Sequence, residues 1–221
     1  MQHKPTLSIQ KLIFAVVFVS AALITSLFVF HLKQKPLKTH TANNNAMIFP
    51  AARDIKPFDL VTSYKAKFTQ NQFRHHWTLL FFGFTHCSSI CPVTLDLLNQ
   101  AYKTLHPAYP MLQVVFISLD PERDQPQALS EYTRSFNPDF IGVSGNIQEI
   151  RKLQSQLGVY ASRDAEATIN DNYQIQHTAS VLLINPTGQW AGLFKSGLNP
   201  KQFTEAFEES ISTFATTRSY L

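Results

Sequence analysis

Glycine, methionine and charged side chains are all scarce in this sequence of 221 residues. Seven glycines beside 12 prolines exclude a collagen-like or low-complexity chain. Charged residues make up only 15% of the chain and hydrophobic residues 44%, a composition too apolar for intrinsic disorder. The three methionines, Met1, Met47 and Met111, are scattered, so no thioether metal site is indicated.

Acidic residues are absent from the first 40 positions, and this absence accounts for the net charge of +4. Five lysines contribute +5 there, and the rest of the chain holds 14 basic and 15 acidic side chains, a net of −1. The positive charge therefore flanks an apolar segment and forms no basic face. Nucleic acid is not expected as a partner.

The apolar segment from Leu12 to Phe30 holds 19 residues and no charge. As a helix it would extend about 28 Å, close to the hydrocarbon thickness of a bilayer. A cleaved signal peptide has a shorter apolar region and a small-x-small site, and no convincing site follows Phe30. We therefore predict a tail at 1–11, a single transmembrane anchor in the lipid bilayer at 12–32 and a linker at 33–56. The lysine counts on the two sides are about equal and do not decide the orientation.

Hydrophobic patterns predict a folded domain at 57–215, followed by a tail at 216–221. Continuous apolar runs predict strands buried on both faces, alternation predicts hairpins, and i, i+3, i+4 spacing predicts helices. The segment 160–176 shows only a weak pattern. The expected strands lie at 58–61, 66–69, 78–85, 114–119, 140–143, 179–184 and 189–194. The expected helices lie from Pro92 to Leu105, at 126–136, between Asn146 and Gly158, and at 200–214.

This order of elements predicts an α/β fold with a central, mostly parallel sheet flanked by helices. A closing antiparallel hairpin followed by a helix is typical of a thioredoxin-like sheet. About 160 residues are enough to bury a core.

The two cysteines, Cys87 and Cys91, follow the first buried strand in the sequence THCSSICP. In a parallel α/β sheet, ligands bind at this edge. Residues at i and i+4 share a helix face, and a helix N-terminus favours thiolate over thiol. Two thiolates suit a soft ion such as Cu(I), and also Zn(II). A redox disulfide between Cys87 and Cys91 is the main alternative, although the spacing is one residue longer than the usual C-x-x-C.

Eight histidines are candidates for a third ligand, and most stand in unsuitable places. His86 neighbours Cys87, but adjacent strand residues point to opposite faces. His177 stands directly before the strand that is expected to abut the cysteine loop. Its position alone supports a metal ligand and an unpartnered loop histidine equally.

The segment from Ser118 to Asp124, SLDPERD, ends the second buried strand at the same sheet edge. Asp120 and Arg123 can form local turn contacts there. The carboxylates of this segment can also support metal ligands by hydrogen bonds.

Three blocks of this sequence resemble the signatures of the SCO/SenC family: FGFTHCSSICP (82–92), FISLDPERD (116–124) and HTASVLLINPTG (177–188). The resemblance covers about residues 57–210. That family comprises membrane-anchored, thioredoxin-fold copper proteins that assist assembly of the CuA centre of cytochrome c oxidase. The resemblance therefore implies that Cys87, Cys91 and His177 hold copper, as Cu(I) or Cu(II). It also implies that Asp120 supports these ligands or takes part in docking a partner.

The resemblance also implies partners and a compartment. The partners are the copper-bearing subunit of cytochrome c oxidase and a copper donor protein. The folded domain is expected in the periplasm, on a single-pass anchor in a bacterial inner membrane. A mitochondrial inner membrane is less favoured, because the N-terminus is neither Arg-rich nor Ser-rich. Ser88 and Ser89 stand where the family often has Pro-Asp or Asp-Glu, and Gln176 stands where it usually has Asp, so the site is less negative.

Two functions of different classes follow. The first is a copper metallochaperone that needs all three ligands. The second is a thiol-disulfide oxidoreductase that keeps the acceptor's cysteines reduced and needs only Cys87 and Cys91. A peroxide-scavenging enzyme is a weaker third possibility, because no peroxiredoxin pattern is present.

Overall fold

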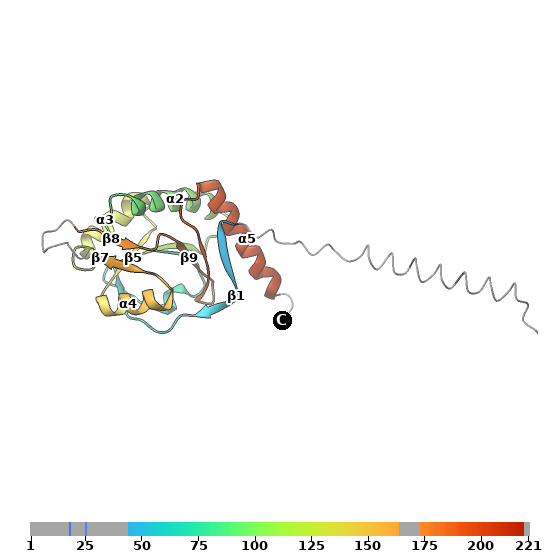
Figure 1. Ribbon diagram of the computed structural model, residues 1–221, viewed down its shortest axis with the longest axis horizontal. Helices are drawn as coiled ribbons and strands as arrows, with labels where there is room; N and C mark the ends of the chain where they lie inside the picture. Colours follow the sequence, from blue (N-terminus) through green and yellow to red (C-terminus); the bar gives the residue numbers. More distant parts are fainter. Residues whose placement is uncertain (1–17, 19–24, 26–43, 164–172, 219–221) are drawn as a thin grey trace, which may run out of the picture. The chain divides into compact units, whose positions relative to one another are not determined.

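The computed structural model describes residues 18, 25, 44–163 and 173–218 (Figure 1). The chain divides into two units, residues 1–42 and 43–221, and the second holds nearly all described residues. The predicted anchor at 12–32 lies outside the described residues except for Phe18 and Thr25, both helical. Within the described part of the chain, no helix is long and apolar enough to cross a membrane.

An eight-stranded sheet forms the centre of the second unit, in the order β1-β10-β9-β4-β5-β6-β2-β3. The pairs β4–β5 and β5–β6 are parallel, and the other neighbours are antiparallel. The predicted α/β fold is therefore confirmed, but the prediction of a mostly parallel sheet is wrong: only the central strands β4, β5 and β6 are parallel, and the other described pairs are antiparallel. The strands are β1 (Ala46–Asp54), β2 (Leu60–Thr62), β3 (Lys67–Phe68), β4 (Trp77–Gly83), β5 (Leu112–Ser118), β6 (Ile141–Ser144), β9 (Val181–Ile184) and β10 (Gln189–Phe194).

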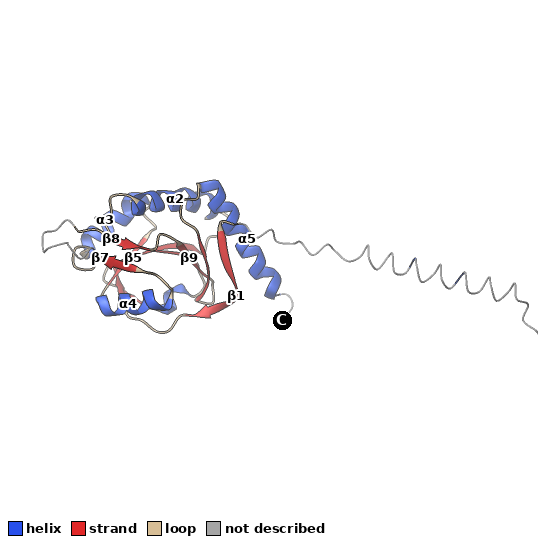
Figure 2. Cartoon of the chain, in the orientation of Figure 1, coloured by secondary structure: helices blue, strands red, loops and turns tan. Residues whose placement is uncertain are grey.

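Helices cover both faces of this sheet, and each face has its own hydrophobic core (Figure 2). Side chains alternate along β4, so Leu79 and Phe81 face one core while Leu80 and Phe82 face the other. Residues of α2, α3 and α5 complete the first core, and residues of α4 complete the second. The helices are α2 (Ile90–Leu105), α3 (Pro126–Phe136), α4 (Ile147–Gln156) and α5 (Pro200–Arg218), and a 3-10 turn, η1, spans Gln70–Phe73.

The residues predicted to begin and end α4, Asn146 and Gly158, are confirmed in these roles. The Asn146 side chain accepts a hydrogen bond of 2.8 Å from the Gln148 N–H, which caps the first turn. Gly158 follows the helix with φ of 61°, a left-handed conformation that favours glycine at a helix end. The last helix runs to Arg218, so the tail predicted from residue 216 begins too early.

The linker prediction is wrong for β1, which lies inside the segment 33–56 and pairs with β10. Its register shifts between Ile48 and Arg53, and Pro50 in that interval cannot donate a ladder hydrogen bond. The shift breaks the strict alternation by which a strand is recognised in a sequence. Phe49 nonetheless packs edge-on against Trp190 at 4.7 Å between ring centroids.

The weakly patterned segment 160–176 also holds regular structure at both ends. Strands β7 (Ala161–Arg163) and β8 (Ile175–His177) form a two-stranded antiparallel sheet apart from the main one. Three-residue strands are too short to show a periodicity. Residues 164–172 between them lie outside the described residues.

Candidate metal centre

The structure brings Cys87, Cys91 and His177 together at the edge of the sheet where β4 ends. Their Sγ and imidazole nitrogen atoms all lie within 4.8 Å of one another. Two sulfur ligands at about 2.3 Å from one ion are no more than about 4.6 Å apart, so this spacing is close to that of a formed site. Cys87 lies in the loop after β4, Cys91 is the second residue of α2, and His177 ends β8.

The two thiols are free and have different environments. Cys87 is half-buried, and burial raises the pKa of its thiol. Hydrogen bonds from the Ser89, Cys91 and Ile90 backbone and from the Cys91 side chain outweigh burial and leave the Cys87 pKa below its ordinary value. Cys91 is fully buried, and this burial raises the pKa of its thiol well above the usual range. Cys87 is therefore the more acidic of the two thiols, as expected near a helix N-terminus.

Gly83, the last residue of β4, makes room for the buried sulfur. A Cβ atom at this position would lie 2.7 Å from the Cys91 Sγ and 2.7 Å from Cε2 of the Phe116 ring. Both distances are shorter than van der Waals contact. Glycine is therefore required here so that Cys91 can approach the end of the strand.

His177 presents one ring nitrogen to the thiols. Its Nδ1 lies 3.0 Å from the Thr178 carbonyl oxygen, which can only accept, so Nδ1 carries the proton. The unprotonated Nε2 lies 3.4 Å from the Cys91 Sγ. Burial lowers the pKa of His177 and keeps the imidazole neutral, the form that binds metals. Phe81 and Phe84 pack edge-on against the ring at 6.0 and 6.1 Å between centroids.

Asp124 connects the cysteine loop to β5. Its carboxylate accepts hydrogen bonds from the Thr85 hydroxyl at 2.6 Å and from the Ser118 hydroxyl at 2.5 Å. The Thr85 backbone N–H donates to both of its oxygens at 3.2 Å. Asp124 is 1% exposed, so it fixes the residue two positions before Cys87 from inside the protein. Sequence reasoning gave the carboxylates of this segment a possible supporting role but singled out Asp120, not Asp124.

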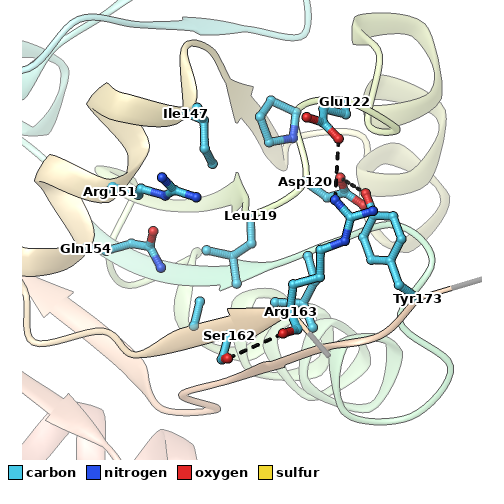
Figure 3. A pocket seen from close by; sticks show the side chains of 12 residues that line it. Leu119, Asp120, Glu122, Ile147, Arg151, Gln154, Ser162, Arg163 and Tyr173 are labelled. Atoms are coloured by element: carbon cyan, nitrogen blue, oxygen red, sulfur yellow. Dashed lines mark hydrogen bonds and ion pairs between the residues drawn. The ribbon is translucent and has the colours of Figure 1, made fainter. Parts of the chain in front are cut away.

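Asp120 anchors the hairpin that carries His177. It forms an ion pair with Arg123 and accepts a hydrogen bond of 2.6 Å from the Tyr173 hydroxyl. The Tyr173 ring lies between two guanidinium groups, with Arg123 3.5 Å and Arg163 3.4 Å from its centroid. Figure 3 shows Asp120, Tyr173 and Arg163 of this group. This arrangement ties both ends of the segment 163–173 to the loop after β5.

The site can hold a soft metal ion through two sulfurs and one imidazole nitrogen. His86 is exposed, and its Nδ1 faces the Thr85 hydroxyl at 3.0 Å, so it stands outside the cluster. Among the described residues, the three atoms form the one group of metal-ligating side chains that converges in this way. Cys87 is the more accessible sulfur, so an ion entering or leaving the site meets it first.

The fold and the site together define a thioredoxin-like α/β protein with a Cys-x-x-x-Cys loop and a facing histidine. The chain belongs to the SCO1/SenC family, whose model matches residues 49–212. The resemblance of its three sequence blocks to that family is confirmed.

Relatives of known name are similar over the same region. The mitochondrial SCO2 homolog of Danio rerio is 33% identical over 159 residues, which are 71% of this chain and 57% of that protein. The SCO2-like protein of Rickettsia prowazekii is 32% identical over 152 residues, 69% of this chain and 74% of that protein. The chain thus spans little more than half of the zebrafish relative.

Solved structures with copper bound share the fold. Arabidopsis thaliana ScoI with copper bound matches 72% of this chain and 98% of that chain, with a TM-score of 0.66 and 30% identity. Yeast Sco1 with copper bound matches 71% of this chain and 87% of that chain, also with a TM-score of 0.66 and 30% identity.

Proposed function

We propose that this chain is a copper metallochaperone that binds copper through Cys87, Cys91 and His177. The observation that carries the proposal is the convergence of these three ligand atoms within 4.8 Å. Two thiolates and one imidazole are ligands that suit Cu(I). The copper-bound structures of similar chains support copper as the metal.

The acceptor we propose is the CuA centre in the copper-bearing subunit of cytochrome c oxidase, and a separate copper donor protein loads the site. Transfer proceeds by ligand exchange. A thiolate of the acceptor binds the copper as Cys87, the more accessible ligand, leaves it and takes up a proton. The acceptor's second thiolate then displaces Cys91 in the same way.

The proposal includes a single-pass anchor at 12–32 that holds the domain on the periplasmic side of a bacterial inner membrane. It rests on the 19 uncharged residues from Leu12 to Phe30. Proteolysis of spheroplasts tests this topology. The domain is expected to be digested from outside, and protection until the membrane is opened would contradict it.

Copper titration of the reduced protein tests the metal site. We expect one copper per chain and a sulfur-to-copper charge-transfer band in the Cu(II) form. His177→Ala is expected to weaken or abolish both, since it removes one of three ligands. His86→Ala is the matched control, because this exposed histidine is one residue from Cys87 but outside the cluster. Equal copper content and spectra in His177→Ala and wild type would overturn the three-ligand site.

The unequal thiol pKa values favour a second function, thiol-disulfide exchange. A Cys87 thiolate attacks a disulfide of the partner, forming a mixed disulfide and releasing one partner thiolate. Cys91 then attacks the Cys87 sulfur and forms the Cys87–Cys91 disulfide, while the second partner thiolate leaves and takes up the Cys91 proton. This reaction does not need His177. Reduction of a model disulfide by His177→Ala at the wild-type rate, faster than by free cysteine, is the expected result. A rate no faster than free cysteine would exclude this function.

A further inference from the structure

A cavity of about 360 Å³ lies between the end of β5, helix α4 and the β7–β8 hairpin (Figure 3). Its lining includes none of the three candidate metal ligands. Leu119, Ile147, Ala161 and Ile175 give it an apolar part. Its volume is within the range of pockets that bind small molecules.

Charged groups on one side of this cavity are already paired. Asp120 is 3% exposed. Arg123 neutralises its carboxylate by an ion pair, and the Tyr173 hydroxyl donates a hydrogen bond to it. Arg163 stacks on the Tyr173 ring, which fixes the position of its guanidinium. Its contact with Glu122 is 3.7 Å long and exposed, so it contributes little.

Arg151 on the other side is unpaired. Figure 3 shows Arg151 and Gln154 projecting from α4 opposite Arg163 and Tyr173. Within the described segments, Arg151 has neither an ion pair nor a hydrogen bond. Gln154 is only 7% exposed, although its amide also lines the cavity. The pocket therefore offers the exposed, unpaired guanidinium of Arg151 and an amide beside an apolar surface.

We propose that this pocket binds a carboxylate attached to a short apolar body. The planar guanidinium of Arg151 matches a carboxylate in a bidentate geometry, and Gln154 can donate a further hydrogen bond. Asp120 and Glu122 lie on the same lining and disfavour a dianion, so inorganic phosphate fits less well than a monocarboxylate. The carboxylate comes either from an acidic side chain of a bound peptide or from a free organic acid.

The pocket shares a structural element with the candidate metal centre. Arg163 pairs with Ile175 across the hairpin, and Ala161 pairs with His177. Three of these four residues line the pocket, and the fourth is the imidazole ligand. The apolar body of a bound ligand therefore lies against the two strands that position His177.

NMR titration of the metal-free full chain, labelled with ¹⁵N, tests the proposal. Butyrate is expected to shift amide signals of α4 and β7–β8 in a saturable way, and butyramide, its neutral analogue, is not. Arg151→Gln is expected to weaken butyrate binding about tenfold, the effect of losing one charge-assisted contact. Lys152→Gln is the control, because it removes a charge from the next residue of the same helix, where Lys152 pairs with Glu149.

The result with other probes identifies the source of the carboxylate. Tighter binding of a capped peptide with one glutamate among alanines supports a protein side chain, and tighter binding of butyrate supports a free acid. Equal binding of butyrate and butyramide, or unchanged binding in Arg151→Gln, overturns the proposal. Stronger binding of inorganic phosphate than of butyrate also overturns it.

Discussion

The candidate metal centre has two halves that are held in different ways. The cysteine half lies on the loop between strand β4 of the main sheet and helix α2. Gly83 leaves room there for the Cys91 sulfur, and buried Asp124 holds Thr85 by hydrogen bonds. The histidine half lies on the separate two-stranded sheet, which Tyr173 ties to Asp120. Changes in the cysteine half are therefore expected to alter both thiol and metal chemistry. Changes in the histidine half are expected to alter metal binding alone.

Gly83→Ala is expected to have the largest effect. The new Cβ would stand 2.7 Å from both the Cys91 Sγ and the Phe116 ring, so the sulfur or the strand must move. We expect the free energy of unfolding to fall by about 3 kcal/mol, the upper range for overpacking. Copper binding and disulfide formation should both weaken. Urea unfolding, copper titration and the rate of disulfide formation measure these effects.

Gly158→Ala is the control for Gly83→Ala. Its Cβ would meet nothing closer than 3.6 Å, but φ of 61° imposes a cost of about 1–2 kcal/mol. Stability is expected to fall without a change at the metal centre. Normal copper binding in Gly83→Ala would contradict the steric explanation.

Asp124→Ala tests the internal connection of the cysteine loop. It removes the acceptor for the Thr85 and Ser118 groups and leaves buried donors unpaired, at a cost of about 2 kcal/mol. Urea unfolding measures the loss, and alkylation of Cys87 reports whether the loop has moved. A loss below about 0.5 kcal/mol, typical of a surface substitution, would show that the connection is unimportant.

The pH dependence of the same group has a defined sign. Burial raises the pKa of Asp124 above its usual value of 3.8, although hydrogen bonds from Ser118 and Thr85 lower it. The folded protein thus binds this proton more tightly than the unfolded chain. The stability that this tighter proton binding by Asp124 contributes is complete below pH 3.8 and is lost as the pH rises through the folded pKa.

Asp124→Asn isolates this contribution, because the amide does not titrate. The stability of the wild type relative to Asp124→Asn is expected to decrease as the pH rises, in urea unfolding of the metal-free protein. An increase with pH would mean that the folded pKa is lowered and that the hydrogen bonds outweigh burial.

The cysteine half was largely predictable from the sequence, because its determinants are local. An apolar run, a Cys-x-x-x-Cys spacing and a helix start follow one another within 78–92. The histidine half was not, because β7 and β8 are short, their sequences ASR and IQH show no periodicity, and they lie on either side of residues 164–174. Position alone left His177 undecided, and the family resemblance selected it.

Long-range contacts also explain the other differences. Asp120 was singled out as the supporting carboxylate, yet Asp124 is the residue that contacts the cysteine loop. Only the fold distinguishes two aspartates four residues apart. Strand β1 was missed because its irregular pairing with β10 hides the alternation.

Tyr173→Phe tests the histidine half with a smaller effect. The change removes the hydroxyl that donates to Asp120 at 2.6 Å and is expected to cost about 1 kcal/mol. Copper affinity should fall severalfold while the rate of disulfide formation stays unchanged. Tyr160→Phe is the control, since Tyr160 is 65% exposed. A slower disulfide reaction in Tyr173→Phe would show that the two halves are not independent.

Tyr132→Phe is the smallest change and concerns the cysteine half. The Tyr132 hydroxyl is buried and, within the described part of the chain, has no hydrogen-bond partner. Burial raises its pKa, and the neighbouring Cys91 and Cys87 raise it further. Replacing an unpaired buried hydroxyl by hydrogen is expected to stabilise the metal-free protein by about 1 kcal/mol.

Thermal and urea unfolding measure the effect of Tyr132→Phe, with Tyr64→Phe as an exposed control expected to change stability by less than about 0.5 kcal/mol. If Tyr132→Phe instead destabilises the protein, the hydroxyl has an acceptor in solution. The candidate acceptors are then the Cys91 and Cys87 sulfurs and the Asp124 carboxylate, the groups whose charges act on the Tyr132 pKa. A hydrogen bond from Tyr132 to a sulfur would stabilise the thiolate form of the cysteine half before any metal binds.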